Sequence, residues 1–333
     1  MRKMRNGQAD FSVNSTRFLS RRATLRLLWS VTVSAWLSIP LAVPADAAEP
    51  IRVMTFNLWH GGDAGKQPLS KTLEVIRAAK PDLLGLQEKP GYAQGATRPD
   101  HGRKLAALLG WNYFGQGEST AILSRFPIVT NTPRKWGVQV RLPTGREAWM
   151  FNAHLMHAPY QPYQLLGIPY AGARFIKTAS EAVSEARQAR GSQVDELLAE
   201  LKPALAARQP VFLTGDFNEP SHQDWTPRAA QAGRCPLAVE YPATLAFTRA
   251  GLRDGFRSFF PDEVTHPGWT WTPRTKSDDP KDRHDRIDFV FVGGPNVTVK
   301  QCEIVGEARK FAAIIVQPYP SDHRAVVATF ELE

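Results

Sequence analysis

Short apolar runs separated by turn residues recur along the chain from residue 51 to its end. Runs of a few residues that are rich in Val, Ile and Phe and bounded by Gly, Pro, Asn or Asp are typical of β-strands. This pattern predicts strands at Ile51–Asn57, Leu83–Gln87, Ala121–Leu123, Ala148–Leu155, Val211–Thr214, Ile287–Val292, Val297–Ile304 and Ala325–Glu331.

Three longer segments have helical spacing of their apolar residues instead. They are Leu69–Ala79, His101–Leu109 and Thr178–Leu201, the last of which is rich in the helix-favouring residues Ala, Glu, Gln and Arg. Early strands alternate with helices, whereas late strands mostly follow one another. This order predicts an α/β protein with sheets packed face to face and helices outside, and not a doubly wound parallel sheet.

The first 47 residues differ in character from the rest. Several arginines precede an apolar stretch, Leu27–Val43, and Ala45-Asp46-Ala47 follows as a small-x-small cleavage pattern. Pro40 and Pro44 argue against a transmembrane helix, which needs roughly 20 unbroken apolar residues. We therefore expect a signal peptide over residues 1–47, and a periplasmic or secreted protein with no stable membrane span.

The export route stays open, because Arg21-Arg22 fits a twin-arginine signal as well as an ordinary basic region. No linker or repeat interrupts the remainder, so we expect a single domain over residues 50–333 and a monomer.

The formal net charge of +9 falls once the predicted signal peptide is set aside. The chain has 41 Lys and Arg residues and 32 Asp and Glu residues. Residues 1–47 hold seven of the basic and two of the acidic residues, so the remainder has 34 basic and 30 acidic residues, a net charge of +4. Such a mild excess suits an anionic substrate without demanding a nucleic acid. Cys235 and Cys302 are the only cysteines, and they can pair or stay free. No Cys-x-x-Cys or His-Glu-x-x-His pattern suggests structural zinc.

Polar side chains that are out of place in apolar runs stand at the ends of most predicted strands. Asn152 and His154 lie two residues apart, hence on one face of their strand, and Asp216 and Asn218 are spaced likewise. Polar groups at strand ends can converge on one mouth of a sheet scaffold, where ligands commonly bind.

These residue types suit phosphoester hydrolysis. Magnesium prefers hard oxygen ligands, which Asn57, Glu88 and Asp322 supply. His154 and His323 can transfer protons or contact phosphate near neutral pH.

Seven short motifs in order carry a family resemblance over the chain from Ile51 to its end. They are Thr55-Phe56-Asn57-Leu58-Trp59, Leu86-Gln87-Glu88, Ala121-Ile122-Leu123-Ser124-Arg125-Phe126-Pro127-Ile128, Asn152-Ala153-His154-Leu155, Thr214-Gly215-Asp216-Phe217-Asn218, Arg286-Ile287-Asp288-Phe289-Val290 and Ser321-Asp322-His323. Together they resemble the endonuclease/exonuclease/phosphatase superfamily. The resemblance implies a four-layer α/β sandwich of two facing, mostly antiparallel sheets flanked by helices, with a metal-dependent site at one end.

The resemblance also implies a metal set. Glu88 matches the main metal ligand, Asn57 lies beside it, and Asp322 lies near the metal. Magnesium is the expected ion, with manganese or calcium as alternatives.

The remaining matches imply the hydrolytic groups. Asp216 matches the carboxylate that orients or activates the attacking water, and Asn218 the amide at the phosphoryl group. His323 matches the catalytic histidine, which Asp288 would orient, and His154 matches a histidine near the leaving group. These are the candidate catalytic residues.

Some alternatives stay open. Asp285 competes with Asp288, which we prefer because an acid inside an apolar strand needs a partner. Glu118 either pairs with the first histidine or lies in a loop, and His157 has no family counterpart.

The segment Met156–Phe175 follows the His154 strand and contains Tyr160, Tyr163 and Tyr170. We expect it to overhang the site and, with Asn152 and Trp271, to bind a small-molecule or lipid phosphoester; the alternative is a loop that only packs on its own protein. Two other functions remain open: a secreted nuclease acting on DNA or RNA, and a non-catalytic binding protein with the same fold.

Overall fold

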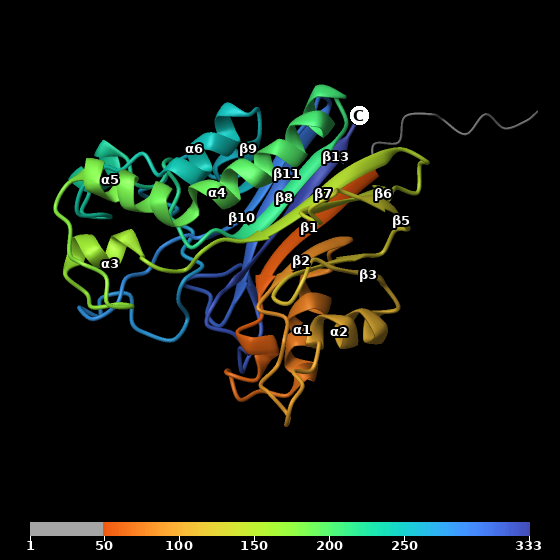
Figure 1. Ribbon diagram of the computed structural model, residues 1–333, viewed down its shortest axis with the longest axis horizontal. Helices are drawn as coiled ribbons and strands as arrows, with labels where there is room; N and C mark the ends of the chain where they lie inside the picture. The colour runs from red at the N-terminus through yellow and green to blue at the C-terminus, as the bar shows by residue number, and fades with distance from the viewer. Residues whose placement is uncertain (1–48) are drawn as a thin grey trace, which may run out of the picture. The chain divides into compact units, whose positions relative to one another are not determined.

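The computed structural model describes residues 49–333, and the predicted signal peptide lies outside the described residues. Two sheets face each other and carry helices on their outer sides (Figure 1). Eight of the strand pairings in this region are antiparallel and three are parallel. The expected α/β sandwich of mostly antiparallel sheets is therefore confirmed.

The larger sheet has the order β12-β11-β13-β1-β2-β4-β3 within residues 49–333. Its strands are β1 (Glu49–Asn57), β2 (Leu83–Gln87), β3 (Asn112–Gly115), β4 (Ala121–Ser124), β11 (Val297–Gly306), β12 (Ile314–Ile315) and β13 (Ala325–Leu332). In the same region, the smaller sheet has the order β5-β6-β7-β8-β10-β9. Its strands are β5 (Ile128–Asn131), β6 (Gly137–Arg141), β7 (Glu147–His154), β8 (Val211–Asp216), β9 (Arg253–Asp254) and β10 (Asp288–Gly293).

Three apolar cores hold these layers together. One lies between the sheets and includes Ile51, Phe212 and Phe330. A second packs the larger sheet against helices α1 (Leu69–Ala79) and α2 (His101–Leu109), whose predicted bounds are both confirmed. The third packs the smaller sheet against α4 and α6, which lie on the opposite outer side in Figure 1. The remaining helical segments are η1 (His60–Gly62), α3 (Gln161–Leu166), α4 (Ala179–Ala206), α5 (Pro227–Gln231), α6 (Pro242–Arg249) and α7 (Gly255–Phe259).

Helix α4 begins where the sequence predicts but ends later. The Thr178 side chain accepts a hydrogen bond from the Glu181 backbone and the Glu181 side chain bonds back to Thr178, which forms a capping box. The helix continues beyond Leu201 through Pro203, because Leu201 and Ala204 stay buried against the smaller sheet. Packing of that face outweighs the backbone hydrogen bond that a proline removes.

The strands that the sequence pattern misses are mostly at sheet edges. β3 and β5 are edge strands with several exposed or half-exposed residues, so they lack a buried apolar run. Cys235 and Cys302 are both buried free thiols. No helix within residues 49–333 combines the length and apolar character needed to cross a bilayer.

Candidate active site

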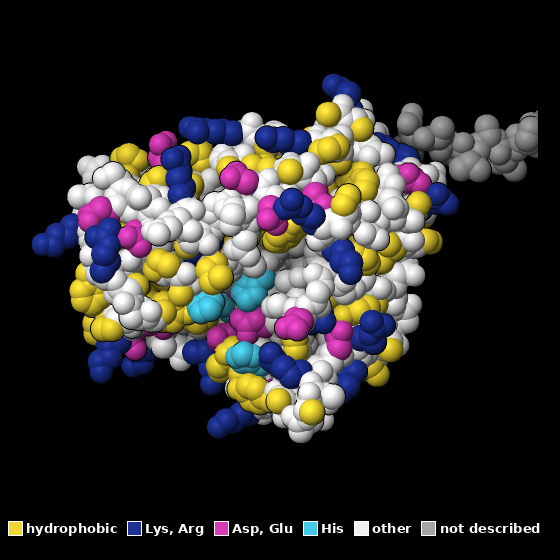
Figure 2. All heavy atoms as spheres, viewed as in Figure 1, with side chains coloured by type: hydrophobic (Ala, Val, Ile, Leu, Met, Phe, Trp, Pro, Cys, Tyr) yellow, Lys and Arg dark blue, Asp and Glu magenta, His cyan; other side chains and the backbone are white. Residues whose placement is uncertain are grey.

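Polar residues from both sheets meet in one cavity of about 580 Å³. Figure 2 shows histidine and acidic side chains gathered in a hollow on this face. Of the residues predicted from sequence, the cavity is lined by Glu88, His154, Tyr160, Tyr163, Tyr170, Asp216, Asn218, Trp271, Asp322 and His323.

The strand register explains why distant residues meet here. Parallel pairing of β1 with β2 places Asn57 beside Gln87, so Glu88 follows directly. Parallel pairing of β7 with β8 places His154 beside Asp216, and antiparallel pairing of β8 with β10 places Asp288 on the other side of Asp216. Three strand ends of the smaller sheet therefore deliver their polar side chains to one edge.

Asn57 donates hydrogen bonds to the carboxylates of Glu88 and Asp216 and so holds both in place. Its Nδ2 donates to Asp216 Oδ2 at 2.9 Å and to Glu88 Oε1 at 3.2 Å. Its Oδ1 accepts a hydrogen bond from the backbone of Trp59 at 2.9 Å. Asn57 is fully buried and does not line the cavity, so it positions the two carboxylates, and its predicted membership of the metal set stays a prediction.

His323 forms a hydrogen-bonded pair with Asp288. The distance from His323 Nδ1 to Asp288 Oδ2 is 2.9 Å, and both side chains are buried. Burial alone would lower the pKa of His323, but the nearby carboxylates of Asp288 and Asp216 outweigh it and raise that pKa well above its usual value. The carboxylates thus favour the positively charged form of the imidazole, whose Nε2 lies 3.6 Å from Asp216 Oδ2.

Asp285 has a different partner set from Asp288. Its carboxylate accepts hydrogen bonds from the Tyr160 hydroxyl at 2.8 Å and from Trp225 Nε1 at 3.1 Å. It therefore supports the aromatic wall of the cavity, whereas Asp288 contacts His323.

His154 lies on the other side of Asp216. Its Nε2 is 3.7 Å from Asp216 Oδ2, and its Nδ1 is 3.3 Å from Ser119 Oγ. The sequence did not predict that Ser119 contacts Nδ1 of His154. Glu118, the residue before it, lines the cavity. A lone serine in a loop carries no pattern by which it stands out.

Glu88 and Asn218 both hold left-handed backbone, each with φ of 49°. Such conformations cost energy in residues other than glycine and concentrate at functional sites. The Asn218 backbone donates to Asp216 Oδ1 at 2.9 Å, and its side-chain Nδ2 donates to the Leu155 carbonyl at 3.0 Å. The turn after β8 thereby fixes the orientation of the Asp216 carboxylate.

Aromatic residues form the opposite wall of the cavity. The Tyr163 hydroxyl donates to Asp282 and accepts from Trp271 Nε1 at 3.4 Å. The Trp271 ring packs on the His323 ring with centroids 4.9 Å apart. Tyr170 packs edge-on against Tyr163 and is 38% exposed. Hydrogen bonds to carboxylates therefore hold this wall in place beside His323.

Asn152 does not reach the cavity, which corrects its predicted role in substrate binding. It is fully buried, its Oδ1 accepts from Gln87 Nε2 at 2.6 Å, and its Nδ2 donates to the Leu86 carbonyl at 3.0 Å. Its polar atoms link the two sheets, because it lies two residues before His154, the last residue of β7, and is therefore inside the sandwich.

The carboxylates at the cavity floor fit a hard divalent cation. Asp322 Oδ1 is buried and has no hydrogen-bond partner among residues 49–333, an arrangement that costs free energy unless a cation satisfies it. Burial raises the pKa of Asp322 to about 7. Burial also works to raise the pKa of Glu88, but His154 and His323 lower it, so Glu88 stays anionic. Glu88 and Asp322 would hold the ion, with oxygen ligands of the kind magnesium prefers.

Asp216, Asp288 and His323 also offer ligand atoms within 4.8 Å of one another. In that cluster Asp288 does not line the cavity, and its Oδ2 already pairs with His323. An ion is therefore better placed at Glu88 and Asp322, which both line the cavity.

Comparison with known proteins gives consistent results. Residues 54–323 match the Endonuclease/Exonuclease/phosphatase family. An uncharacterized protein of Caenorhabditis elegans, F14F9.5, is 30% identical over an aligned length of 306 residues, and the match covers 84% of this chain and 91% of that protein.

Two solved structures share the fold. The endonuclease/exonuclease/phosphatase of Beutenbergia cavernae is 21% identical, with a TM-score of 0.52 over 85% of this chain and 72% of that one. An AP endonuclease from Archaeoglobus fulgidus is 15% identical, with a TM-score of 0.50 over 84% of this chain and 98% of that one.

Proposed function

Because the chain belongs to the Endonuclease/Exonuclease/phosphatase family, whose members are generally metal-dependent phosphoester hydrolases, we propose that it hydrolyses small organic phosphoesters with a divalent cation. One observation carries the proposal: the Asp216 carboxylate lies between two histidines at a cavity that also holds Glu88 and Asp322.

Each group has a place in the proposed reaction. Asp216, held by Asn57, orients a water and accepts its proton as the water oxygen bonds to phosphorus. The bond from phosphorus to the leaving oxygen breaks, and His154 supplies the proton that this oxygen takes up. The positively charged His323 binds the phosphoryl oxygens as negative charge develops on them. A bound divalent cation would neutralise phosphoryl charge as a Lewis acid.

The volume and the aromatic lining of the cavity support a small substrate. A volume of about 580 Å³ falls in the range of roughly 300–1,000 Å³ that is usual for small-ligand pockets. Tyr160, Tyr163 and Trp271 present ring surfaces beside His323, so the organic group of the substrate would pack on them. This assigns the Tyr-rich segment to pocket formation; docking on a lipid surface is the competing proposal.

The charge of the lining argues against a nucleic-acid polymer as the preferred substrate. Proteins that bind such polymers neutralise many phosphates with Lys and Arg. Among the described residues that line this cavity, Arg98 is the one Lys or Arg. A nuclease therefore remains the second candidate, which the same assay tests.

The test is a substrate panel with matched variants. Purified protein with magnesium, manganese or calcium would be assayed on p-nitrophenyl phosphate, bis-p-nitrophenyl phosphate, phosphatidylcholine vesicles, plasmid DNA and RNA. We expect turnover of the small esters, and its loss in Asp216→Asn but not in Asp278→Asn, a change at an exposed acid outside the cavity.

Turnover confined to DNA or RNA would replace the small-ester proposal with the nuclease. Turnover confined to vesicles would establish the lipid substrate. No turnover of any substrate with any of the three ions would favour a binding protein.

We propose in addition that the protein is exported. The basic, apolar and small-residue order of residues 1–47 supports this. Expression with a C-terminal tag, cell fractionation and mass measurement of the product test it; a full-length product found only in the cytoplasm would contradict it.

A further inference from the structure

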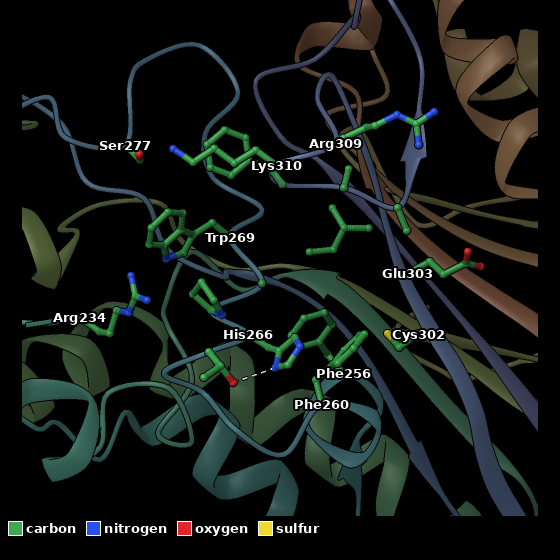
Figure 3. A pocket seen from close by; sticks show the side chains of 17 residues that line it. Arg234, Phe256, Phe260, His266, Trp269, Ser277, Cys302, Glu303, Arg309 and Lys310 are labelled. Atoms are coloured by element: carbon green, nitrogen blue, oxygen red, sulfur yellow. Dashed lines mark hydrogen bonds between the residues drawn. The ribbon is translucent and has the colours of Figure 1, made fainter. Parts of the chain in front are cut away.

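A second cavity of about 590 Å³ lies apart from the candidate active site, and the two cavities share no lining residue. Its walls come from the segment after α7, from β11 and from the turn that follows β11 (Figure 3). It is as large as the candidate active site and within the usual range for small-ligand pockets.

Aromatic rings line this cavity from two sides. Trp269 and Phe311 lie with ring centroids 6.2 Å apart, and Figure 3 shows Trp269 across the cavity from the labelled rings of His266, Phe256 and Phe260. His266 stacks on Phe260 at 4.8 Å with an interplanar angle of 19°. Ring surfaces that face a common space suit a planar aromatic ligand, which can stack on one and meet the other edge-on.

Positive charge surrounds the same space. Arg234, Arg309 and Lys310 line the cavity, and none of them forms a salt bridge with an acid among residues 49–333. The one acid among the lining residues, Glu303, is paired with Arg52, and Glu307, the acid nearest in sequence to Arg309, is paired with Arg324. The cavity therefore carries uncompensated positive charge beside its aromatic walls.

We propose that this second cavity binds a small organic anion that carries a planar aromatic ring. The ring would lie between Trp269 and the His266–Phe260 stack, and the anionic group would meet Arg234 and Lys310. The proposal does not depend on the proposed hydrolysis, because no residue of the candidate active site takes part in it.

Calorimetric titration of the full chain tests the ligand class. We expect 1-naphthalenesulfonate to bind at least tenfold more tightly than the neutral naphthalene-1-sulfonamide and than methanesulfonate, which has no ring. Equal binding of the three compounds, or no binding of the first, would overturn the proposal.

Three variants test the location. The double variant Arg234→Gln/Lys310→Gln should weaken binding about tenfold, which corresponds to ~1.4 kcal/mol. Ala313→Trp, at an exposed lining residue, should block the cavity while the charges remain. Arg98→Gln removes the one arginine that lines the other cavity and should leave binding unchanged.

Binding that survives both changes in the second cavity, or that is lost in Arg98→Gln, would place the ligand elsewhere. Binding that is lost in the double variant but retained in Ala313→Trp would show only surface attraction between charges. Either result would also overturn the proposal.

Discussion

Arg190 and Glu219 form a fully buried ion pair, with Arg190 Nε 3.0 Å from Glu219 Oε2. The pair links the middle of α4 to the segment just after the Asp216 turn. Arg190 also donates to the carbonyls of Met156 at 2.8 Å and Pro159 at 3.2 Å, and it contacts Gln161. One guanidinium therefore holds the start of the Tyr-rich segment, Met156–Phe175, against the end of the smaller sheet that lies at the candidate active site.

Arg190→Met is expected to destabilise the fold strongly, because it leaves the buried Glu219 carboxylate without its positively charged partner and with only the backbone hydrogen bond from Ala243. Breaking a buried ion pair from one side costs about 3–5 kcal/mol. Urea unfolding measures the loss, and Arg187→Met, at an exposed position of the same helix, is the control. A loss no larger than that of the control would show that Glu219 finds other partners or takes up a proton.

Asp288→Asn should change the pH dependence of hydrolysis as well as its rate. The Asp288 carboxylate helps to raise the pKa of His323, so the wild-type imidazolium persists as pH rises and is lost only above that raised pKa. Without the carboxylate the pKa falls, so the alkaline decline in kcat/KM should begin at lower pH. The rate itself should fall by at least about 100-fold.

Rate profiles of wild type and Asp288→Asn from pH 5 to 10 test this. A profile with the same alkaline limb and only a lower plateau would contradict the link between Asp288 and the charge of His323.

Magnesium should stabilise the protein more at pH 8 than at pH 6. Burial raises the pKa of Asp322 to about 7 from an ordinary value near 3.8, so the folded state holds this proton more tightly than the unfolded state. Without metal, stability therefore falls as pH rises from about 4 through 7. Because a cation binds the deprotonated carboxylate, its effect should grow over the same interval.

Thermal unfolding with and without magnesium, at both pH values, measures this dependence. In Asp322→Asn the magnesium effect should be smaller and no longer depend on pH. An unchanged pH dependence in that variant would assign the effect to another group.

The sequence predicted the sheets well where strands are buried, and it predicted that polar residues at the ends of those strands meet at one cavity. Glu88, His154 and Asp216 stand out because each follows an apolar run, and the strand register then brings them together. The same reasoning failed at Asn152. It shares a face with His154, but it lies inside the sandwich, where it bonds to Gln87.

The sequence pattern could not predict which loop residues contact the candidate active site. Ser119 contacts His154, and Arg98 reaches within 3.5 Å of His60 Nδ1, yet neither belongs to a periodic pattern. The second cavity was not foreseen either, because its rings and cations come from segments far apart in the chain. Only the folded chain shows that Trp269 and Trp271 line different cavities.

Tyr163 should contribute to substrate choice through its ring more than through its hydroxyl. Tyr163→Leu removes a ring surface from the cavity, whereas Tyr163→Phe keeps the ring and removes only the bonds to Asp282 and Trp271. An aromatic pair contributes about 0.5–1.5 kcal/mol, so Tyr163→Leu should raise KM for bis-p-nitrophenyl phosphate by up to about tenfold. KM for methyl p-nitrophenyl phosphate, whose second ester group is too small to reach the wall, should change little in either variant. If Tyr163→Leu impaired both substrates equally, the wall would be supporting the catalytic groups and not selecting the organic part of the substrate.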